Sequence, residues 1–195
     1  EGDAIAVALL SRLSDLAPVC FVNGNHEMCV ERDQPERYQK FMDDLKNGGV
    51  QVLHNETACF WIDGEKVAVT GYELPWEYYR RFSRRHPSVV GMERSIGKRK
   101  QDAYQILLTH NPVFFEEYTA WGADFTFAGH LHGGFIRLPY FGGVISPQFQ
   151  LFPKYDHGLY QMDTSSMVVG AGMGNHSGLF RINNPTEIVT VRIKR

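Results

Sequence analysis

Apolar residues near the start of the chain recur at helical spacing and then give way to short apolar runs. This spacing predicts a helix over residues 3–16, whose buried face carries Ile5, Leu9, Leu13 and Leu16. A second helix is predicted from residues 33–35, where proline takes an early helical position, to residues 48–49, a glycine pair. Residues 113–118 predict a third, short helix.

Short apolar runs between these helices predict strands at residues 19–22, 50–53, 58–62, 66–70, 104–108 and 123–128. Asp63 and Gly64 join two of the runs and are a strong signal for a tight hairpin turn. In the last third, the clearest strand pattern is at residues 187–194, where Val189, Val191 and Ile193 alternate with polar residues. Helices and strands that alternate early, followed mostly by strands, indicate a single α/β domain over residues 1–195.

Composition and charge exclude some classes of protein. The chain has 195 residues, of which 43% are hydrophobic and 22% charged, as in ordinary globular domains. No apolar stretch reaches the ~18 residues that are needed to span a bilayer. The formal net charge is −2, and we see no nucleic-acid-reading motif. We therefore expect no nucleic-acid partner.

One segment departs from this charge balance, and we call it the basic island, residues 80–100. It contains eight basic residues and one acid, namely Arg80, Arg81, Arg84, Arg85, Arg94, Lys98, Arg99, Lys100 and Glu93. Aromatic residues interleave with its start, namely Trp76, Tyr78, Tyr79 and Phe82. Such a segment is either a solvated surface or a contact for anionic substrate or lipid headgroups. Because like charges repel, we predict that it binds an anionic partner, through peripheral membrane contact of residues 76–100.

Polar residues that can bind metal ions follow three of the predicted strands. They are Gly24-Asn25-His26-Glu27, Thr109-His110-Asn111-Pro112 and Gly129-His130-Leu131-His132-Gly133-Gly134, which hold four of the eight histidines. Open α/β sheets place their sites at the carboxyl ends of strands. Imidazole with amide or carboxylate oxygen suits Zn, Fe, Mn or Ni, and the absence of a cysteine cluster argues against a closed structural zinc site.

These motifs resemble those of the calcineurin-like metallophosphoesterase family. Asn25-His26-Glu27 after Gly24 is similar to the family's Gly-Asn-His-Asp/Glu motif, His110 to its strand-end histidine, and Gly129-His130-Leu131-His132 to its Gly-His-x-His motif. The C-terminal part, including Asn184-Pro185-Thr186-Glu187-Ile188, resembles the branch of small, often membrane-associated bacterial phosphoesterases. Some relatives in this branch cleave the pyrophosphate of UDP-diacylglucosamine. The resemblance covers nearly the whole chain and implies a two-sheet αββα sandwich.

The resemblance also implies roles for five residues. Asn25, His110 and His130 would hold one divalent metal ion and His132 a second, with Mn, Fe, Zn or Ni as the candidate metals. His26 would be catalytic and face the scissile phosphate, as general acid or as charge-stabilising donor. The implied reaction is hydrolysis of a phosphoester or pyrophosphate bond by a metal-activated hydroxide. The implied substrate is a phosphorylated small molecule or a lipid-linked compound.

The sequence departs from the family's pattern at two earlier motifs, an Asp-x-His and a Gly-Asp whose carboxylate bridges both metals. Gly2 and Asp3 spell the second motif, but no strand precedes them, so a helix N-cap is the favoured role for Asp3. We expect that the first strand–loop units are missing and that the sandwich is incomplete at its N-terminus. Apolar surface would then be exposed at an open sheet edge. We also expect that these residues alone are a poor hydrolase.

Some alternatives remain open at this point. A phosphoesterase-like binding module without catalysis is the alternative function, because the upstream ligands are absent. Asp124 either orients a ligand or caps a turn, and His176 either contacts substrate or serves a glycine-rich turn. The expected location is the cytoplasm or the membrane surface, with any N-terminal anchor outside this chain.

Overall fold

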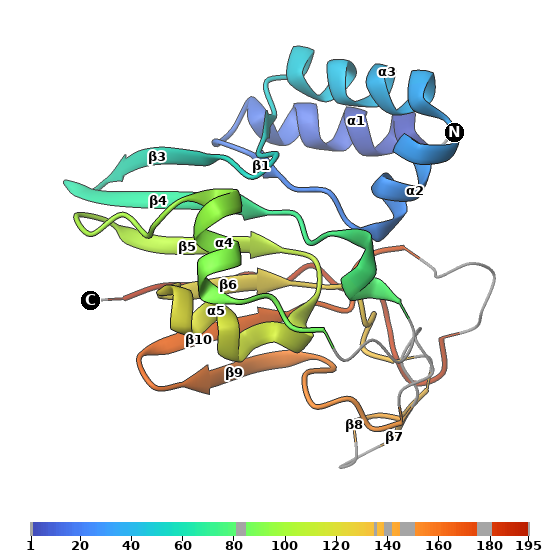
Figure 1. Ribbon diagram of the computed structural model, residues 1–195. Coiled ribbons are helices and arrows are strands. Elements are labelled where there is room, and N and C mark those ends of the chain that lie inside the picture. Colours follow the sequence, from blue (N-terminus) through green and yellow to red (C-terminus); the bar gives the residue numbers. More distant parts are fainter. Residues whose placement is uncertain are drawn as a thin grey trace.

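A six-stranded sheet forms the centre of the molecule. The computed structural model describes residues 2–80, 85–134, 136–138, 142–144, 151–174 and 181–194 (Figure 1). The strand order is β3-β4-β5-β6-β10-β9. These strands are β3 (Thr57–Ile62), β4 (Glu65–Tyr72), β5 (Tyr104–Thr109), β6 (Phe125–Ala128), β9 (Gly158–Met162) and β10 (Ser165–Val169). Because β4, β5, β6 and β10 run parallel, their carboxyl ends meet at one edge.

Two small sheets and five helices accompany the central sheet in the described part of the chain. β1 (Cys20–Phe21) pairs in parallel with β2 (Gln51–Val52), and β7 (Arg137–Leu138) pairs with β8 (Gly142–Gly143) in antiparallel fashion. The helices are α1 (Gly2–Ser14), α2 (Asn25–Asp33), α3 (Pro35–Asn47), α4 (Val89–Ile96) and α5 (Phe115–Trp121). Two 3₁₀ turns, η1 (Trp76–Tyr79) and η2 (Pro112–Phe114), lie next to motif residues in space or sequence.

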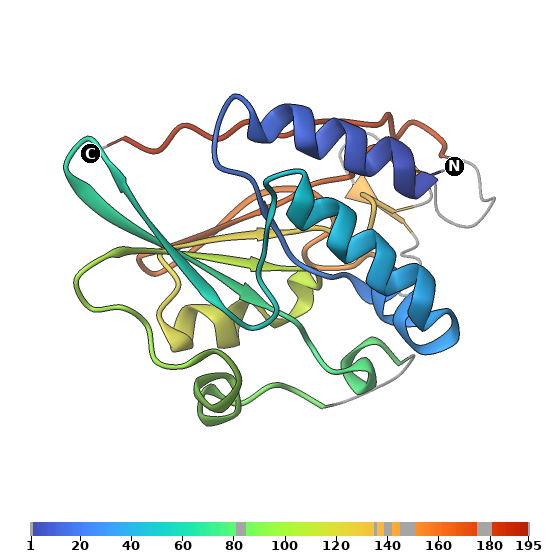
Figure 2. The same ribbon diagram turned by 90° about the horizontal axis from the view of Figure 1, so that it is seen from above.

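The helices form two layers on either side of the central sheet. Helices α4 and α5 cover one face, whereas α1 and α3 form a separate layer together with β1 and β2 (Figures 1 and 2). The core under α4 and α5 contains Met92, Leu107 and Tyr118, which are essentially inaccessible to solvent. A second core, between α1, α3 and the β1–β2 pair, contains Met42 and Leu45. The predicted α/β fold is confirmed, and its second sheet is the two-stranded β1–β2 pair.

The predicted helix at residues 3–16 exists, but its predicted core face is wrong. Ile5 is 70% exposed and Leu16 83% exposed. Instead, Val7 and Leu10 pack against the core that α1 shares with α3. The helix has two apolar faces. The face with Val7 and Leu10 packs against α3, and the face predicted from the spacing is exposed.

Two further expectations are wrong. Residues 187–194 form no strand, although several of them line a recess together with Phe125, Leu159 and Val168. A strand forms only where a segment hydrogen-bonds to a neighbouring strand, and alternation of apolar residues does not supply that neighbour. In addition, the motif Asn25-His26-Glu27, which as a strand-end motif was expected to lie in a loop, begins the helix α2.

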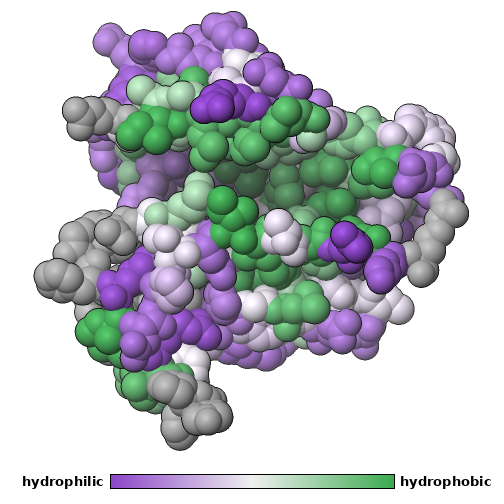
Figure 3. Space-filling view, turned by 180° about the vertical axis from the view of Figure 1, so that it is seen from behind, coloured by the Kyte–Doolittle hydropathy of each residue, from purple (hydrophilic) through white to green (hydrophobic). Residues whose placement is uncertain are grey.

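An apolar groove opens on the face of the sheet away from α4 and α5. It encloses about 650 Å³ between Pro18, Cys20 and the sheet residues Phe60, Trp61, Ile62, Val67, Val69, Ile106, Leu108 and Phe127. Figure 3 shows this hydrophobic hollow from behind. Trp61 is 73% exposed and Ile62 56% exposed, so apolar side chains on this face of the sheet are open to solvent. The expected exposed apolar surface is therefore present, and the expectation of missing strand–loop units stays a prediction. Within the described ranges, no helix has the length and apolar character that crossing a bilayer requires.

Candidate metal centre

Three motifs meet at the carboxyl edge of the central sheet. His110 follows β5, His130 follows β6, and Asn25 opens α2 after β1. The Asn25 Oδ1 and His130 Nδ1 atoms are 3.0 Å apart, and the ring centroids of His110 and His130 are 5.0 Å apart. The backbone N–H of Gly129 donates to the carbonyl of His110 at 3.1 Å, which ties the two strand ends together. The structure therefore brings together Asn25, His110 and His130.

Gly24 lets His110 come this close to the start of α2. A Cβ atom added to Gly24 would lie 2.9 Å from both Cε1 and Nδ1 of His110, closer than packed atoms tolerate. The Glu27 carboxylate accepts the Gly24 N–H at 2.8 Å and caps the helix. This cap places Asn25 and His26 in the first helical turn, where their backbone is fixed.

The second histidine pair lies on a turn with an unusual backbone. His130 and His132 have φ values of 65° and 49°, in the left-handed region, followed by Gly133 and Gly134 at 70° and 82°. Between the two histidines, Leu131 is completely buried and anchors the turn. Non-glycine residues adopt this conformation at an energetic cost, and such residues occur in turns and cluster at functional sites. Gly133 and Gly134 adopt these angles readily and turn the backbone away after the two histidines.

His110 is held as a neutral imidazole. Desolvation of its ring, together with nearby His132 and His26, lowers its pKa to about 4. Its Nε2 atom is buried and has no hydrogen-bond partner among the described residues. Neutral imidazole is the form that binds a metal ion, and a buried ring nitrogen without a protein partner is chemically suited to that role.

The donors fit a metal site in chemistry and burial, but they do not form a closed ligand set. His132 is half-buried and His26 exposed, and both act electrostatically on His110. Within the ranges that the structure describes, no three His, Cys, Asp or Glu side chains are arranged to hold a metal ion. The set of four proposed ligands and the role of His26 therefore stay predictions.

Tyr79 belongs to this centre, which corrects one expectation. It is 7% exposed, and its ring centroid lies 5.1 Å from that of His130 and 6.2 Å from that of His110. Burial raises the pKa of its hydroxyl well above the usual range. Tyr79 therefore packs against the histidines. Its ring is not available to insert into a membrane, although the sequence pattern had suggested membrane contact for residues 76–100.

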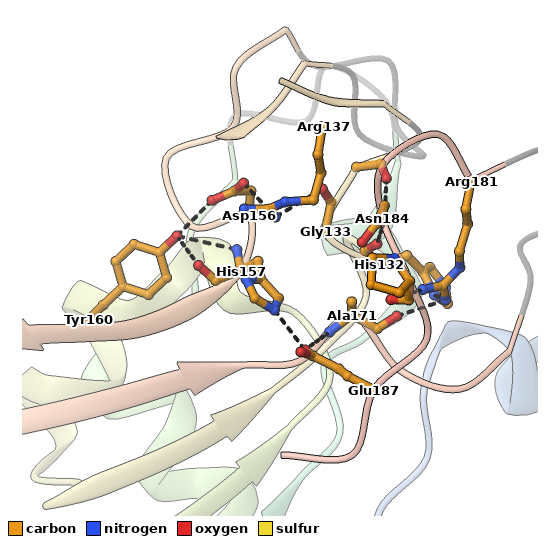
Figure 4. A network of polar contacts seen from close by, with 12 residues as sticks. His132, Gly133, Arg137, Asp156, His157, Tyr160, Ala171, Arg181, Asn184 and Glu187 are labelled. Atoms are coloured by element: carbon orange, nitrogen blue, oxygen red, sulfur yellow. Dashed lines mark hydrogen bonds and ion pairs between the residues drawn. The ribbon is translucent and has the colours of Figure 1, made fainter. Parts of the chain in front are cut away.

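A C-terminal segment, residues 181–187, closes over the histidine turn, and we call it the strap (Figure 4). The Asn184 side-chain amide donates to the carbonyls of His132 at 2.5 Å and Gly134 at 2.6 Å. A Cβ atom on Gly133 would lie 2.8 Å from the Asn184 Oδ1 atom, so glycine makes room for this clamp. The Arg181 guanidinium donates to the carbonyl of Ala171 at 2.8 Å and lies 3.4 Å from His132 Nδ1.

Further polar contacts fix the strap and the turn to the sheet (Figure 4). The Glu187 carboxylate accepts the Ala171 N–H at 2.7 Å and lies 2.8 Å from the Nε2 atom of His157. Arg137 donates to the Gly133 carbonyl at 3.3 Å and forms an ion pair with Asp156 at 3.1 Å. His157 thus holds the strap through Glu187.

A second network lies behind Gly24. The Asn23 side chain donates to the Tyr38 hydroxyl at 2.6 Å. The Glu73 carboxylate, directly after β4, accepts the backbone N–H of Asn23 at 3.2 Å and contacts His54 Nδ1 at 2.9 Å. Burial raises the pKa of the Glu73 carboxyl. No local pattern singled out this network, because its members come from separate parts of the chain.

Other candidates take different positions. Asp3 lies inside the first turn of α1, and its carboxylate pairs with Arg37 at 2.7 Å. The expected N-cap role is therefore wrong, because the helix already includes Gly2.

Asp124 accepts the Gln105 N–H at 2.7 Å and pairs with Arg99 at 3.4 Å. It lies just before β6, at the end of the strand away from His130. His176 lies outside the described residues, as do Arg81, Phe82 and Arg84.

Comparison with known proteins agrees with these motifs. The chain is 30% identical over 102 residues to the uncharacterized metallophosphoesterase YkuE of Bacillus subtilis, covering 52% of this chain and 35% of that protein. It is 24% identical over 185 residues to the phosphodiesterase YaeI of Escherichia coli, covering 95% of this chain and 62% of that protein. It is also 25% identical over 158 residues to the UDP-2,3-diacylglucosamine pyrophosphatase LpxG of Chlamydia trachomatis, covering 76% and 43%.

The chain thus spans between about a third and two thirds of the length of these relatives. No solved structure matches it significantly. The family model described as calcineurin-like phosphoesterase matches residues 3–134, which include all three histidine motifs. The chain belongs to the calcineurin-like phosphoesterase family.

Proposed function

We propose that the protein is a metal-dependent hydrolase of phosphoester or pyrophosphate bonds. The observation that carries this proposal is the convergence of Asn25, His110 and His130 at the carboxyl edge of the sheet. Membership of the family supports the same reaction class, as do the names of the phosphodiesterase and pyrophosphatase relatives.

The residues of the candidate centre would have two kinds of role, namely binding metal ions and acting on the substrate. Asn25, His110 and His130 would hold one divalent ion, and His132 would contribute to a second. When bound, such ions polarise a phosphoryl oxygen and lower the pKa of a coordinated water. Tyr79 excludes solvent from the two histidine rings that it packs against. His26 lies exposed in the first turn of α2, where it can donate a proton or hydrogen bond to the leaving oxygen.

We further propose that the substrate contains a phosphoanhydride or a lipid-linked phosphate. This proposal rests on the similarity to a relative named for a UDP-2,3-diacylglucosamine substrate. We further propose that the described part of the basic island contacts an anionic membrane surface. In support, Arg94, Lys98 and Lys100 are exposed, as is Trp76 at 41%.

The test is a substrate panel with the full-length gene product loaded with Mn²⁺, comparing phosphomonoesters, phosphodiesters and pyrophosphates. We expect His130→Ala to reduce both metal content and turnover. His26→Ala should retain metal and lower turnover by ~10²–10⁴-fold, the usual effect of losing one proton donor. His86→Ala is the matched control, because His86 is exposed and pairs with Glu117 away from the motifs.

Two outcomes would contradict the proposal. Loss of metal in His26→Ala equal to that in His130→Ala would make His26 a ligand instead of a catalytic residue. Absence of turnover on every substrate by the metal-loaded protein would favour the alternative, a binding module without catalysis.

A further inference from the structure

Arg181 places a positive charge against the candidate metal centre. Its Nη2 atom lies 3.4 Å from His132 Nδ1 and donates to the carbonyls of Ala171 and Gly174. Its Nη1 atom makes a long contact of 3.4 Å to the Pro185 carbonyl. The backbone carbonyls hold the guanidinium in place beside His132 (Figure 4).

No carboxylate balances this charge in the described part of the chain. Arg181 forms no ion pair there, and its Nε atom is buried without a hydrogen-bond partner among those residues. The carboxylate nearest in the strap, Glu187, is occupied by the Ala171 N–H and His157. On the opposite side of the centre, Glu27 caps Gly24, and Glu73 binds His54 and Asn23. Arg181 is half-buried, and an anion from outside the chain would stabilise a partly desolvated cation that has no counter-ion.

The contact between Arg181 and His132 cannot persist when His132 binds a metal ion. A guanidinium only donates, so His132 Nδ1 must offer its lone pair to Arg181. If Nδ1 binds the metal, that lone pair is used. If Nε2 binds the metal, the remaining ring proton must be on Nδ1, which then cannot accept. In both cases Arg181 loses this partner and keeps its carbonyl anchors, with donors facing the centre.

We propose that Arg181 binds an anionic phosphoryl oxygen of the substrate once His132 has bound metal. The inference rests on the proposed hydrolase function and names a substrate-binding residue for it. Guanidinium groups bind phosphate oxygens through strong, directional hydrogen bonds, which a lysine ammonium does not reproduce. Arg181 lies outside residues 3–134, the part of the chain that the family model matches.

The test uses inorganic phosphate as the probe and calorimetry on the Mn²⁺-loaded protein as the readout. Arg181→Gln should weaken phosphate binding roughly 10- to 100-fold, the effect of losing hydrogen bonds to a charged group. Its metal content should equal that of the unmodified protein. Arg181→Lys should fall between the two. Arg192→Gln is the matched control, because Arg192 is exposed on the same C-terminal stretch. With a phosphodiester that the protein hydrolyses, Arg181→Gln should raise KM more than it lowers kcat.

Three results would overturn the inference. In the first, Arg181→Gln and the unmodified protein bind phosphate with equal affinity. In the second, neither protein binds phosphate. In the third, Arg181→Gln loses metal and phosphate together. The last result would make Arg181 a residue that only positions His132. Failure of the hydrolase proposal looks different: phosphate binding would depend on Arg181 while no ester or anhydride is cleaved. Turnover with an unchanged KM in Arg181→Gln would reject the inference and leave the hydrolase proposal intact.

Discussion

Gly24 and His110 show how strongly the centre depends on single atoms. The His110 ring occupies the space where any side chain at position 24 would begin, with 2.9 Å to an added Cβ. The same ring is desolvated and has its Nε2 atom buried. The position of a candidate ligand is therefore set by the absence of one carbon atom on a neighbouring segment.

We predict that Gly24→Ala displaces His110 and weakens metal binding, and that it costs about 1–3 kcal/mol of unfolding free energy, as overpacking typically does. Denaturant unfolding and metal titration by calorimetry measure the two effects. Gly129→Ala is the matched control from the other motif, because an added Cβ there meets nothing within 4 Å. Unchanged metal affinity in Gly24→Ala would mean that the ring can shift without leaving the centre.

At the scale of elements, the strap acts on a turn that lies at least fifty residues earlier in the sequence, since Asn184 contacts residues 52 and 50 positions before it. The Asn184 amide bridges two carbonyls of a backbone segment whose two histidines have positive φ. Asn184 is 5% exposed, so these carbonyls have no easy replacement by bulk water. The clamp offsets part of the strain that the turn stores.

We predict that Asn184→Leu, which keeps the size but removes the donor, lowers the unfolding free energy by about 1–3 kcal/mol. It should also reduce metal affinity, because the His132 backbone is no longer held. Asn183→Gly serves as the control, since Asn183 is exposed with a φ of 53° that glycine accepts readily. A stability loss with wild-type metal affinity would show that the strap stabilises the fold without positioning His132.

At the scale of the whole molecule, some charged and aromatic residues of the segment over residues 76–100 contact other parts of the fold, and others are exposed to solvent. Tyr79 and Arg99 of the segment over residues 76–100 are engaged with the histidine centre and with Asp124. Trp76 lies with the Arg32 guanidinium 5.7 Å from its ring centroid. Arg94 and Lys98, at the end of α4 and just after it, remain exposed. These two exposed residues are suited to a test of the membrane proposal.

We predict that Arg94→Glu with Lys98→Glu weakens binding to anionic vesicles by at least about 30-fold, since each basic side chain near such a surface adds ~1 kcal/mol and the new carboxylates are repelled. Co-sedimentation at low and high salt, with neutral and anionic lipid, measures this. Lys40→Glu with Lys46→Glu on α3 is the matched double control, because both lysines are exposed. Binding that ignores lipid charge and salt in the unmodified protein would return the basic island to a solvated surface.

Local patterns were sufficient for the elements whose side chains pack against sequence neighbours. The hairpin at Asp63–Gly64 and the strands ending before His110 and His130 are where the spacing predicts them. The buried face of α1 and the strand at residues 187–194 were predicted wrongly. Each depends on which partner surface the segment meets, and a repeat of apolar residues carries no information about the partner.

The sequence by itself determined the mixed α/β class, the family motifs and the three segments that carry the candidate ligands. It did so because strand ends, turns and motif spacing are local properties of the chain. Only the tertiary structure decided that Tyr79, Asn184 and Arg181 join the histidines, and that Asp3 and Asp124 do not. These contacts depend on distances between segments that are far apart in sequence, and such distances are fixed only when layers of the fold pack together.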